Sequence, residues 1–240
     1  MSGNPIHFGT SGWRAIIADE FTFANVRRAV AAIAGHVLAQ ARKPTLIIGH
    51  DTRFFSEEFS CTATGVLRTH GVRVLLCQYP TPTPAIAYEI LRRKTDGAIN
   101  FTASHNPAEY HGLKFSGPDG GPALPEVTHD IEARVVKIQF VPEPSEESTS
   151  PDEKINPRET YLARLGELVN FDAIRKANRR WVCDPRWGTG AGYLARVLAN
   201  HGVNVTAIHT DRDVFFGGHG PDVSEANLAP LSQAVREYGA

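Results

Sequence analysis

VLRTHGVRV at residues 66–74 is repeated as VLANHGVNV at residues 197–205, with six identical residues in nine. In each copy the apolar spacing predicts the end of a helix, the His-Gly pair is typical of a helix C-terminus, and the valines after it predict a strand. In both halves an aspartate, Asp51 or Asp184, lies at a similar distance before this helix. The repeat therefore predicts two α/β domains that share a common plan.

Apolar periodicity around each copy extends this prediction along the chain. The predicted helices cover 26–41, 57–69, 85–93, 161–169, 193–200 and 231–238, and the predicted strands cover 46–48, 72–76, 97–101, 181–183 and 203–208. Alternating helices and strands of this kind are typical of the α/β class. We expect each domain to be a mixed sheet packed between helices.

A change in composition divides the chain. The run VPEPSEESTSPDEK at residues 141–154 is rich in proline and acidic residues and has no apolar periodicity, which predicts an interdomain linker. We therefore expect a first domain at 1–140, a linker at 141–156 and a second domain at 157–240.

Composition excludes several classes of protein. The chain is 42% hydrophobic with a formal net charge of -1, so it lacks the basic excess of a nucleic-acid-binding protein. Neither a secretory signal nor an apolar stretch of membrane-spanning length is present, and we expect a cytoplasmic protein. The three cysteines, Cys61, Cys77 and Cys183, form no CxxC pair and are expected to be reduced structural thiols.

The sequence gives little support to a zinc enzyme or to a dinucleotide-binding enzyme. The ten histidines show no HExxH spacing, and His70 and His201 are predicted to be helix C-terminal residues rather than zinc ligands. The glycine run GTGAG at residues 188–192 departs from the GxGxxG spacing of dinucleotide-binding loops.

The strand at 97–101 leads directly into TASHNP at residues 102–107, and this places Ser104 at a strand-to-loop transition. Taken alone the run is typical of a polar turn, but a serine at the end of a rigid strand is also a candidate nucleophile. Such a serine needs a base or a cationic environment, which His105, Lys114 and Arg14 could supply. FGTSGWR at residues 8–14 has the glycines, hydroxyls and arginine with which a loop can wrap an anion.

Four motifs occur in an order that resembles the alpha-D-phosphohexomutase family, the phosphoglucomutases and phosphomannomutases. They are FGTSGWR at 8–14, GHDTRFFS at 49–56, TASHNP at 102–107 and HGLKFSGPDGG at 111–121, and the resemblance continues through DPRWGTGAGYL at 184–194 and FGGHGPDVSEANL at 216–228. It covers nearly the whole chain. The fold it implies is a series of repeated α/β domains, in agreement with the internal repeat.

The resemblance implies a reaction centred on Ser104, which matches the serine that carries a phosphoryl group in active family members. That phosphoserine interconverts hexose 1-phosphate and hexose 6-phosphate through a hexose 1,6-bisphosphate intermediate. By the same resemblance, Arg14 holds the phosphoserine or the incoming phosphate, Lys114 lies near the reacting oxygens, and His105 contacts the substrate hydroxyl or assists proton transfer. The motifs do not distinguish glucose, mannose and glucosamine phosphates.

Two further hydroxyl residues of the first motif, Thr10 and Ser11, are expected to bind phosphate together with Arg14, His105 and Lys114. One departure lies in the fourth motif, where many family members carry asparagine and this chain has His111. A histidine keeps a hydrogen-bonding side chain at that position.

Family members bind Mg²⁺ through a loop of the form DGDxDR, which this sequence lacks; the segment most similar to it is HTDRD at 209–213. Of the implied metal ligands only Ser104, through its phosphate, is present. We therefore expect the N-terminal part of a longer mutase, with an incomplete second domain, which needs its C-terminal domains and is inactive by itself. A non-catalytic sugar-phosphate-binding or inactive fragment is the alternative that the sequence leaves open.

Overall fold

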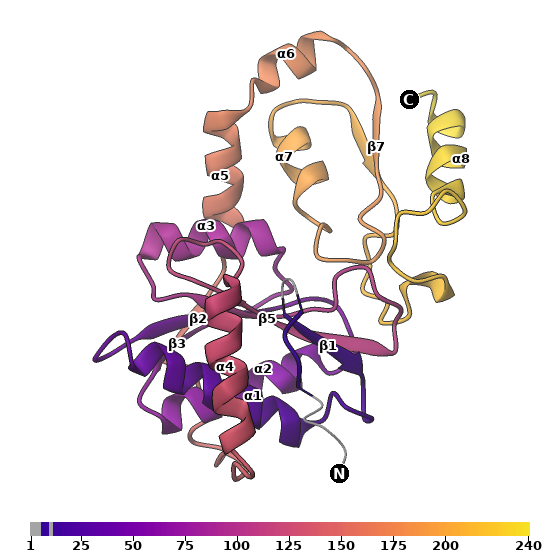
Figure 1. Ribbon diagram of the computed structural model, residues 1–240. Coiled ribbons are helices and arrows are strands. Elements are labelled where there is room, and N and C mark those ends of the chain that lie inside the picture. The colour runs from indigo at the N-terminus through magenta and orange to yellow at the C-terminus, as the bar shows by residue number, and fades with distance from the viewer. Residues whose placement is uncertain (1–5, 10–11) are drawn as a thin grey trace. The chain divides into compact units, whose positions relative to one another are not determined.

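The computed structural model describes residues 6–9 and 12–240 of the chain (Figure 1). The chain forms two compact units. The first comprises the described residues of Met1–Asp51 with Phe55–Ala103 and Glu109–Asn156, and the second comprises Thr52–Phe54, Ser104–Ala108 and Pro157–Ala240.

The first unit is built on a six-stranded sheet with the order β1-β5-β4-β2-β3-β6. The strands are β1 (Trp13–Ile16), β2 (Thr45–His50), β3 (Arg73–Cys77), β4 (Ala98–Phe101), β5 (Tyr110–Ser116) and β6 (Glu153–Ile155). Strands β4, β2, β3 and β6 are parallel, whereas β5 is antiparallel to both β4 and β1. The predicted mixed sheet is therefore confirmed.

Four helices cover the two faces of this sheet (Figure 1): α1 (Phe23–Leu38), α2 (Ser56–Thr69), α3 (Thr83–Arg93) and α4 (Pro125–Lys137). Helices α1, α2 and α4 pack on one face, where Ile33, Ile48 and Phe59 are completely or almost completely buried. Helix α3 packs on the other face through Ile86 and Ile90. Because both faces of β2 are covered, this strand has a continuous apolar sequence rather than an alternating one.

The segment predicted as a linker, 141–156, ends in strand β6, which adds to the sheet beside β3. The carboxylate of Asp152 accepts a hydrogen bond from the amide of Val74 at 2.8 Å, and the Arg68 guanidinium donates to the carbonyl of Ser150 at 2.6 Å. A three-residue edge strand buries only one side chain well, Ile155, so it has no apolar periodicity that could be detected in the sequence.

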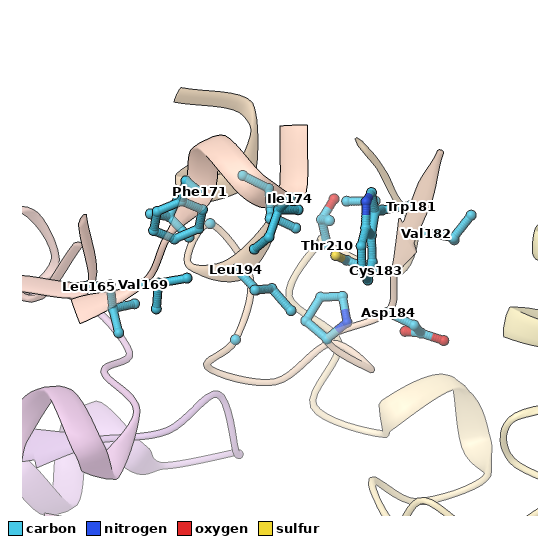
Figure 2. A pocket seen from close by; sticks show the side chains of 17 residues that line it. Leu165, Val169, Phe171, Ile174, Trp181, Val182, Cys183, Asp184, Leu194 and Thr210 are labelled. Atoms are coloured by element: carbon cyan, nitrogen blue, oxygen red, sulfur yellow. The ribbon is translucent and has the colours of Figure 1, made fainter. Parts of the chain in front are cut away.

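Within 157–240 the second unit contains α5 (Arg158–Leu168), α6 (Phe171–Lys176), β7 (Trp181–Cys183), α7 (Leu194–Asn200), β8 (Val205–Ala207), a 3-10 turn at Phe216–Gly218 and α8 (Ala229–Tyr238). Strands β7 and β8 pair in parallel. An apolar cavity of about 610 Å³ lies among α5, α6, α7 and the strand pair, and Figure 2 shows Phe171, Leu194 and Trp181 around it.

The repeat noticed in the sequence corresponds to equivalent structure. Both α2 and α7 end at the histidine of the His-Gly pair, and the glycines Gly71 and Gly202 have φ angles of 83° and 73°. The assignment of His70 and His201 to helix C-termini is therefore confirmed. The three cysteines are free, and among the described residues no helix has the length and apolar character needed to cross a membrane.

Candidate active site

Ser104 lies three residues after the end of strand β4 in the chain. The ladder ends at Thr102, whose amide donates to the Gly112 carbonyl at 2.9 Å. Two residues later Ser104 is exposed and has a φ of 59°, in the left-handed region that few serines occupy. The Ser104 hydroxyl lies 3.4 Å from Nδ1 of His105, which is also exposed. The predicted nucleophile and its candidate proton acceptor therefore lie together on one loop.

The main chain of this loop is held by Arg53, which belongs to the same unit. Arg53 is completely buried, and its guanidinium donates to the carbonyls of Ser104 at 3.0 Å, Asn106 at 2.6 Å and Pro107 at 2.7 Å. In the sequence Arg53 lies within the motif GHDTRFFS, but no role could be assigned to it there. The signal available was an arginine three residues beyond a buried strand, which does not reveal which loop it contacts.

Two further residues of the second unit, Arg212 and Phe216, contact Arg53. The Arg212 guanidinium donates to the carbonyls of Thr52 at 3.1 Å and Arg53 at 3.2 Å. The Arg53 guanidinium lies 5.0 Å from the centre of the Phe216 ring, within the range of a cation–π interaction. Both the main chain and the side chain of Arg53 are therefore restrained.

In the first unit, Arg14 and Lys114 lie on the adjacent strands β1 and β5. Burial lowers the pKa of Lys114, the Arg14 guanidinium lowers it further, and the Asp51 carboxylate opposes both effects. Gly12 permits this packing, because a Cβ at its position would lie 2.4 Å from the Leu113 carbonyl oxygen and 3.0 Å from Cγ of Lys114. The two predicted phosphate-binding cations are thus electrostatic neighbours.

Asp51 is also part of a buried hydrogen-bond chain that includes His111. The Ser56 hydroxyl donates to the Asp51 carboxylate at 2.9 Å and lies 3.0 Å from Nε2 of His111. Nδ1 of His111 accepts from the Gly112 amide at 2.9 Å and lies 3.3 Å from the Gly112 carbonyl oxygen. The ring stacks on Phe21 at 5.0 Å between centroids. His111 therefore fills an aromatic core and helps to orient Asp51.

The predicted site residues fall into two groups. Ser104 and His105 belong to the second unit with Arg53, whereas Arg14 and Lys114 belong to the first unit with Asp51. Thr10 and Ser11, the predicted phosphate-binding hydroxyls, lie outside the described residues.

Comparison with known proteins assigns both parts of the chain to one family. The profile for phosphoglucomutase/phosphomannomutase alpha/beta/alpha domain I matches residues 5–142, and that for domain II of the same family matches residues 159–240. A probable phosphoglucosamine mutase from Methanosphaera stadtmanae is 28% identical over 240 residues, which are 100% of this chain and 52% of that protein. Another from Pyrococcus abyssi is 31% identical over 215 residues, covering 88% of this chain and 44% of that protein.

The fold has a close structural counterpart. A putative phosphomannomutase from Thermus thermophilus superposes with a TM-score of 0.86 at 33% identity, covering 98% of this chain and 52% of that one. The chain spans about half the length of the curated relatives it matches. Because the two family profiles together cover most of its residues, the chain belongs to the phosphoglucomutase/phosphomannomutase family.

Proposed function

We propose that this chain is the phosphoserine-bearing part of a phosphohexomutase that interconverts hexose 1-phosphate and hexose 6-phosphate. The observation that carries the proposal is the exposed Ser104, held at a φ of 59° on a loop whose main chain is hydrogen-bonded to Arg53. Non-glycine residues in this conformation concentrate at active sites, where the surrounding structure maintains the strain. Family membership supplies the class of reaction.

The proposed chemistry begins with a hexose 1,6-bisphosphate. Oγ of Ser104 attacks one phosphorus atom, a new P–O bond forms, and the bond from phosphorus to the sugar oxygen breaks. The serine proton passes to the departing sugar oxygen, and His105, 3.4 Å from the hydroxyl, is placed to carry it. The phosphoserine then transfers its phosphoryl group to the free hydroxyl of a hexose monophosphate, whose proton returns to Oγ, and this forms the 1,6-bisphosphate. Ser104 next takes the other phosphoryl group of that bisphosphate, so the positional isomer is released and the phosphoserine is restored.

Phosphoryl transfer depends on positioning and on neutralising the charge of the phosphoryl oxygens. Arg14 and Lys114 are the cations proposed for this role, with Thr10 and Ser11 as additional phosphate donors. The planar guanidinium of Arg14 suits two phosphate oxygens at once, whereas Lys114 acts as a point charge. The lowered pKa of Lys114 reflects a partly desolvated ammonium, and a phosphate bound beside it would compensate for the lost water.

The resemblance also implies Mg²⁺. Among the described residues no group of three His, Cys, Asp or Glu side chains could hold a metal ion, so the residues present do not fit it. We further propose that the activity of the complete mutase depends on additional chain of the kind that the relatives possess beyond the matched half, and that these 240 residues alone show little turnover. The proposed domain division stays at 1–140 and 157–240.

The test is transfer of a phosphoryl group to the purified chain. The protein is incubated with the 1,6-bisphosphates of glucose, mannose and glucosamine, whose comparison also reports the preferred sugar, and its intact mass is followed. We expect the mass of one phosphoryl group to be added and to map to Ser104. Ser104→Ala should abolish the addition, whereas Ser145→Ala, an exposed serine in the first unit, should not. An unmodified wild-type chain with all three donors would contradict the proposal.

A further inference from the structure

We propose that Arg53 is a positioning residue for this reaction: its guanidinium holds the Ser104 loop in the strained conformation that presents the serine hydroxyl to the phosphoryl donor. The inference rests on the proposed function, since it concerns the rate at which Ser104 is phosphorylated. Arg53 itself contacts the loop main chain and no reacting atom.

The geometry of the contact is specific to a guanidinium. Three carbonyls, those of Ser104, Asn106 and Pro107, accept hydrogen bonds at 2.6–3.0 Å from two terminal nitrogens of one planar group. A planar fork with fixed N–H directions sets the orientation of the three peptide groups relative to one another. An ammonium group has no such fixed plane and cannot reproduce this pattern.

The loop needs such a restraint because of where its strain lies. A serine at a φ of 59° is less stable than the same serine in an extended or right-handed helical conformation, so an unrestrained loop would relax. With the carbonyls of Ser104, Asn106 and Pro107 directed toward the buried Arg53, the side chains of Ser104 and His105 stay exposed. The restraint and the exposure of the nucleophile are therefore two results of one contact.

The chain offers a matched control. Arg186 occupies the corresponding place after β7, is 5% exposed, and donates to the carbonyls of Gly220, at 2.8 Å, and Asn227. It holds a loop in the same way but contacts no residue of TASHNP. A conservative change at Arg186 therefore measures the general cost of weakening a buried arginine.

The experiment compares Arg53→Lys with Arg186→Lys in the Ser104 phosphorylation assay. We expect Arg53→Lys to lower the rate constant of phosphoryl transfer by about ten- to 100-fold, because small misplacements of a nucleophile have effects of this size. The Kd of the bisphosphate, measured calorimetrically on Ser104→Ala backgrounds, should change less than about twofold, since the loss is confined to the transition state. Arg186→Lys should leave both quantities within about twofold of wild type.

A second variant separates positioning from folding. In Arg53→Ala, added guanidinium ions at concentrations well below denaturing should restore part of the rate, and ammonium ions at the same concentration should not. A merely structural role predicts no such selective rescue.

The outcomes are distinct from those of the proposed function. If wild-type Ser104 is never phosphorylated, the proposed function fails first. If wild type is phosphorylated, a wild-type rate in Arg53→Lys overturns the inference, and so does an equal loss in both lysine variants. Global unfolding of both Arg53 variants, seen by circular dichroism, also overturns it, because Arg53 would then stabilise the unit rather than the loop.

Discussion

The turns after β2 and β7, Asp51-Thr52-Arg53 and Asp184-Pro185-Arg186, use the same residues in different ways. In each, the aspartate accepts hydrogen bonds at the end of a parallel strand, and the arginine is buried and donates to carbonyls of a distant loop. The Asp184 carboxylate accepts a hydrogen bond from the Arg186 amide at 2.8 Å and lies 3.0 Å from Nδ1 of His209. The Asp51 carboxylate instead lies in the electrostatic environment of Lys114.

In both turns, the arginine of the Asp-x-Arg sequence after a strand donates hydrogen bonds to the main chain of a loop far away in the sequence. The turn specifies no chemistry by itself. The first turn holds a loop with an exposed serine and the second holds one through Gly220 and Asn227. Strain is present in both, at Ser104 in the first region and at Arg186, Trp187 and His209 in the second. The second loop also carries an exposed serine, Ser224, but of these two serines only Ser104 has a positive φ.

The largest expected loss of stability comes from replacing the two buried arginines, Arg53 and Arg186. Arg53→Met should lower the free energy of unfolding by about 3 kcal/mol and Arg186→Met by about 2 kcal/mol, because the first removes the donor to three carbonyls and the second the donor to two. Urea denaturation of each variant measures this. Arg164→Met, at an exposed i,i+3 ion pair, should cost less than about 0.5 kcal/mol. A larger loss at Arg186 than at Arg53 would contradict the comparison.

The repeated glycines after α2 and α7 test whether the two helix ends are equivalent. Gly71→Ala should cost about 1 kcal/mol, because alanine is strained at a φ of 83° although nothing lies within 4 Å of its Cβ. Gly202→Ala should cost somewhat more, since its Cβ would lie 3.2 Å from Cδ of Arg175. Thermal unfolding of both variants compares them directly. Equal shifts in Tm would show that Arg175 moves aside freely.

The electrostatic difference between the aspartates predicts a pH dependence. Asp51→Asn should lower the pKa of Lys114 still further, because it removes the one carboxylate that favours the charged ammonium, and Arg14→Gln should raise it. Titration of the Lys114 side chain by NMR measures both changes. Since the folded pKa lies below the unfolded value, the unfolded chain binds more protons between them and stability rises with pH in that window. Asp184→Asn is the control and should leave the Lys114 titration unchanged.

The smallest expected effect is a difference in alkylation rate among the cysteines, which compares the accessibility of the two units' cores. Burial raises the pKa of Cys77 in the first unit to about 12, and burial also raises the pKa of Cys183, which lines the apolar cavity of the second unit. Alkylation by iodoacetamide at neutral pH should therefore be fastest at the exposed Cys61, slower at Cys183 and slowest at Cys77. Peptide mass spectrometry gives the order. Modification of Cys77 before Cys183 would show that the first core opens more readily than the second.

The elements that could be predicted from the sequence are those with a long apolar period. Helices α1, α2 and α3 and strands β2, β3 and β4 lie within a few residues of their predicted positions. Strands β1 and β5 and helix α4 were not predicted. Strand β5 contains Gly112 and Lys114 among apolar residues, so its sequence has no clear alternation, and its conformation is imposed by pairing with β1 and β4 on either side.

The candidate site divides in the same way. Ser104 and His105 could be identified because they follow a strongly apolar strand and end in Asn-Pro, both of which are local signals. Arg53 could not be given a role, because its partners lie more than fifty residues away along the chain. In the sequence His111 differs from other histidines only in departing from a family pattern. Its contacts with Ser56 and Phe21 depend on how α2 and the strands pack.

The α/β class, the repeated unit and the serine loop could all be read from the sequence, because each depends on residues adjacent in the chain or at a helical or strand period. Tertiary packing was needed to establish which buried arginine holds the serine loop, that Lys114 and Arg14 are neighbours, and that the run at 141–156 ends in an edge strand. These features depend on contacts between segments that are distant in the sequence. Such contacts are stabilised by burial and hydrogen bonding in the folded chain, and they produce no hydrophobic periodicity from which they could be predicted.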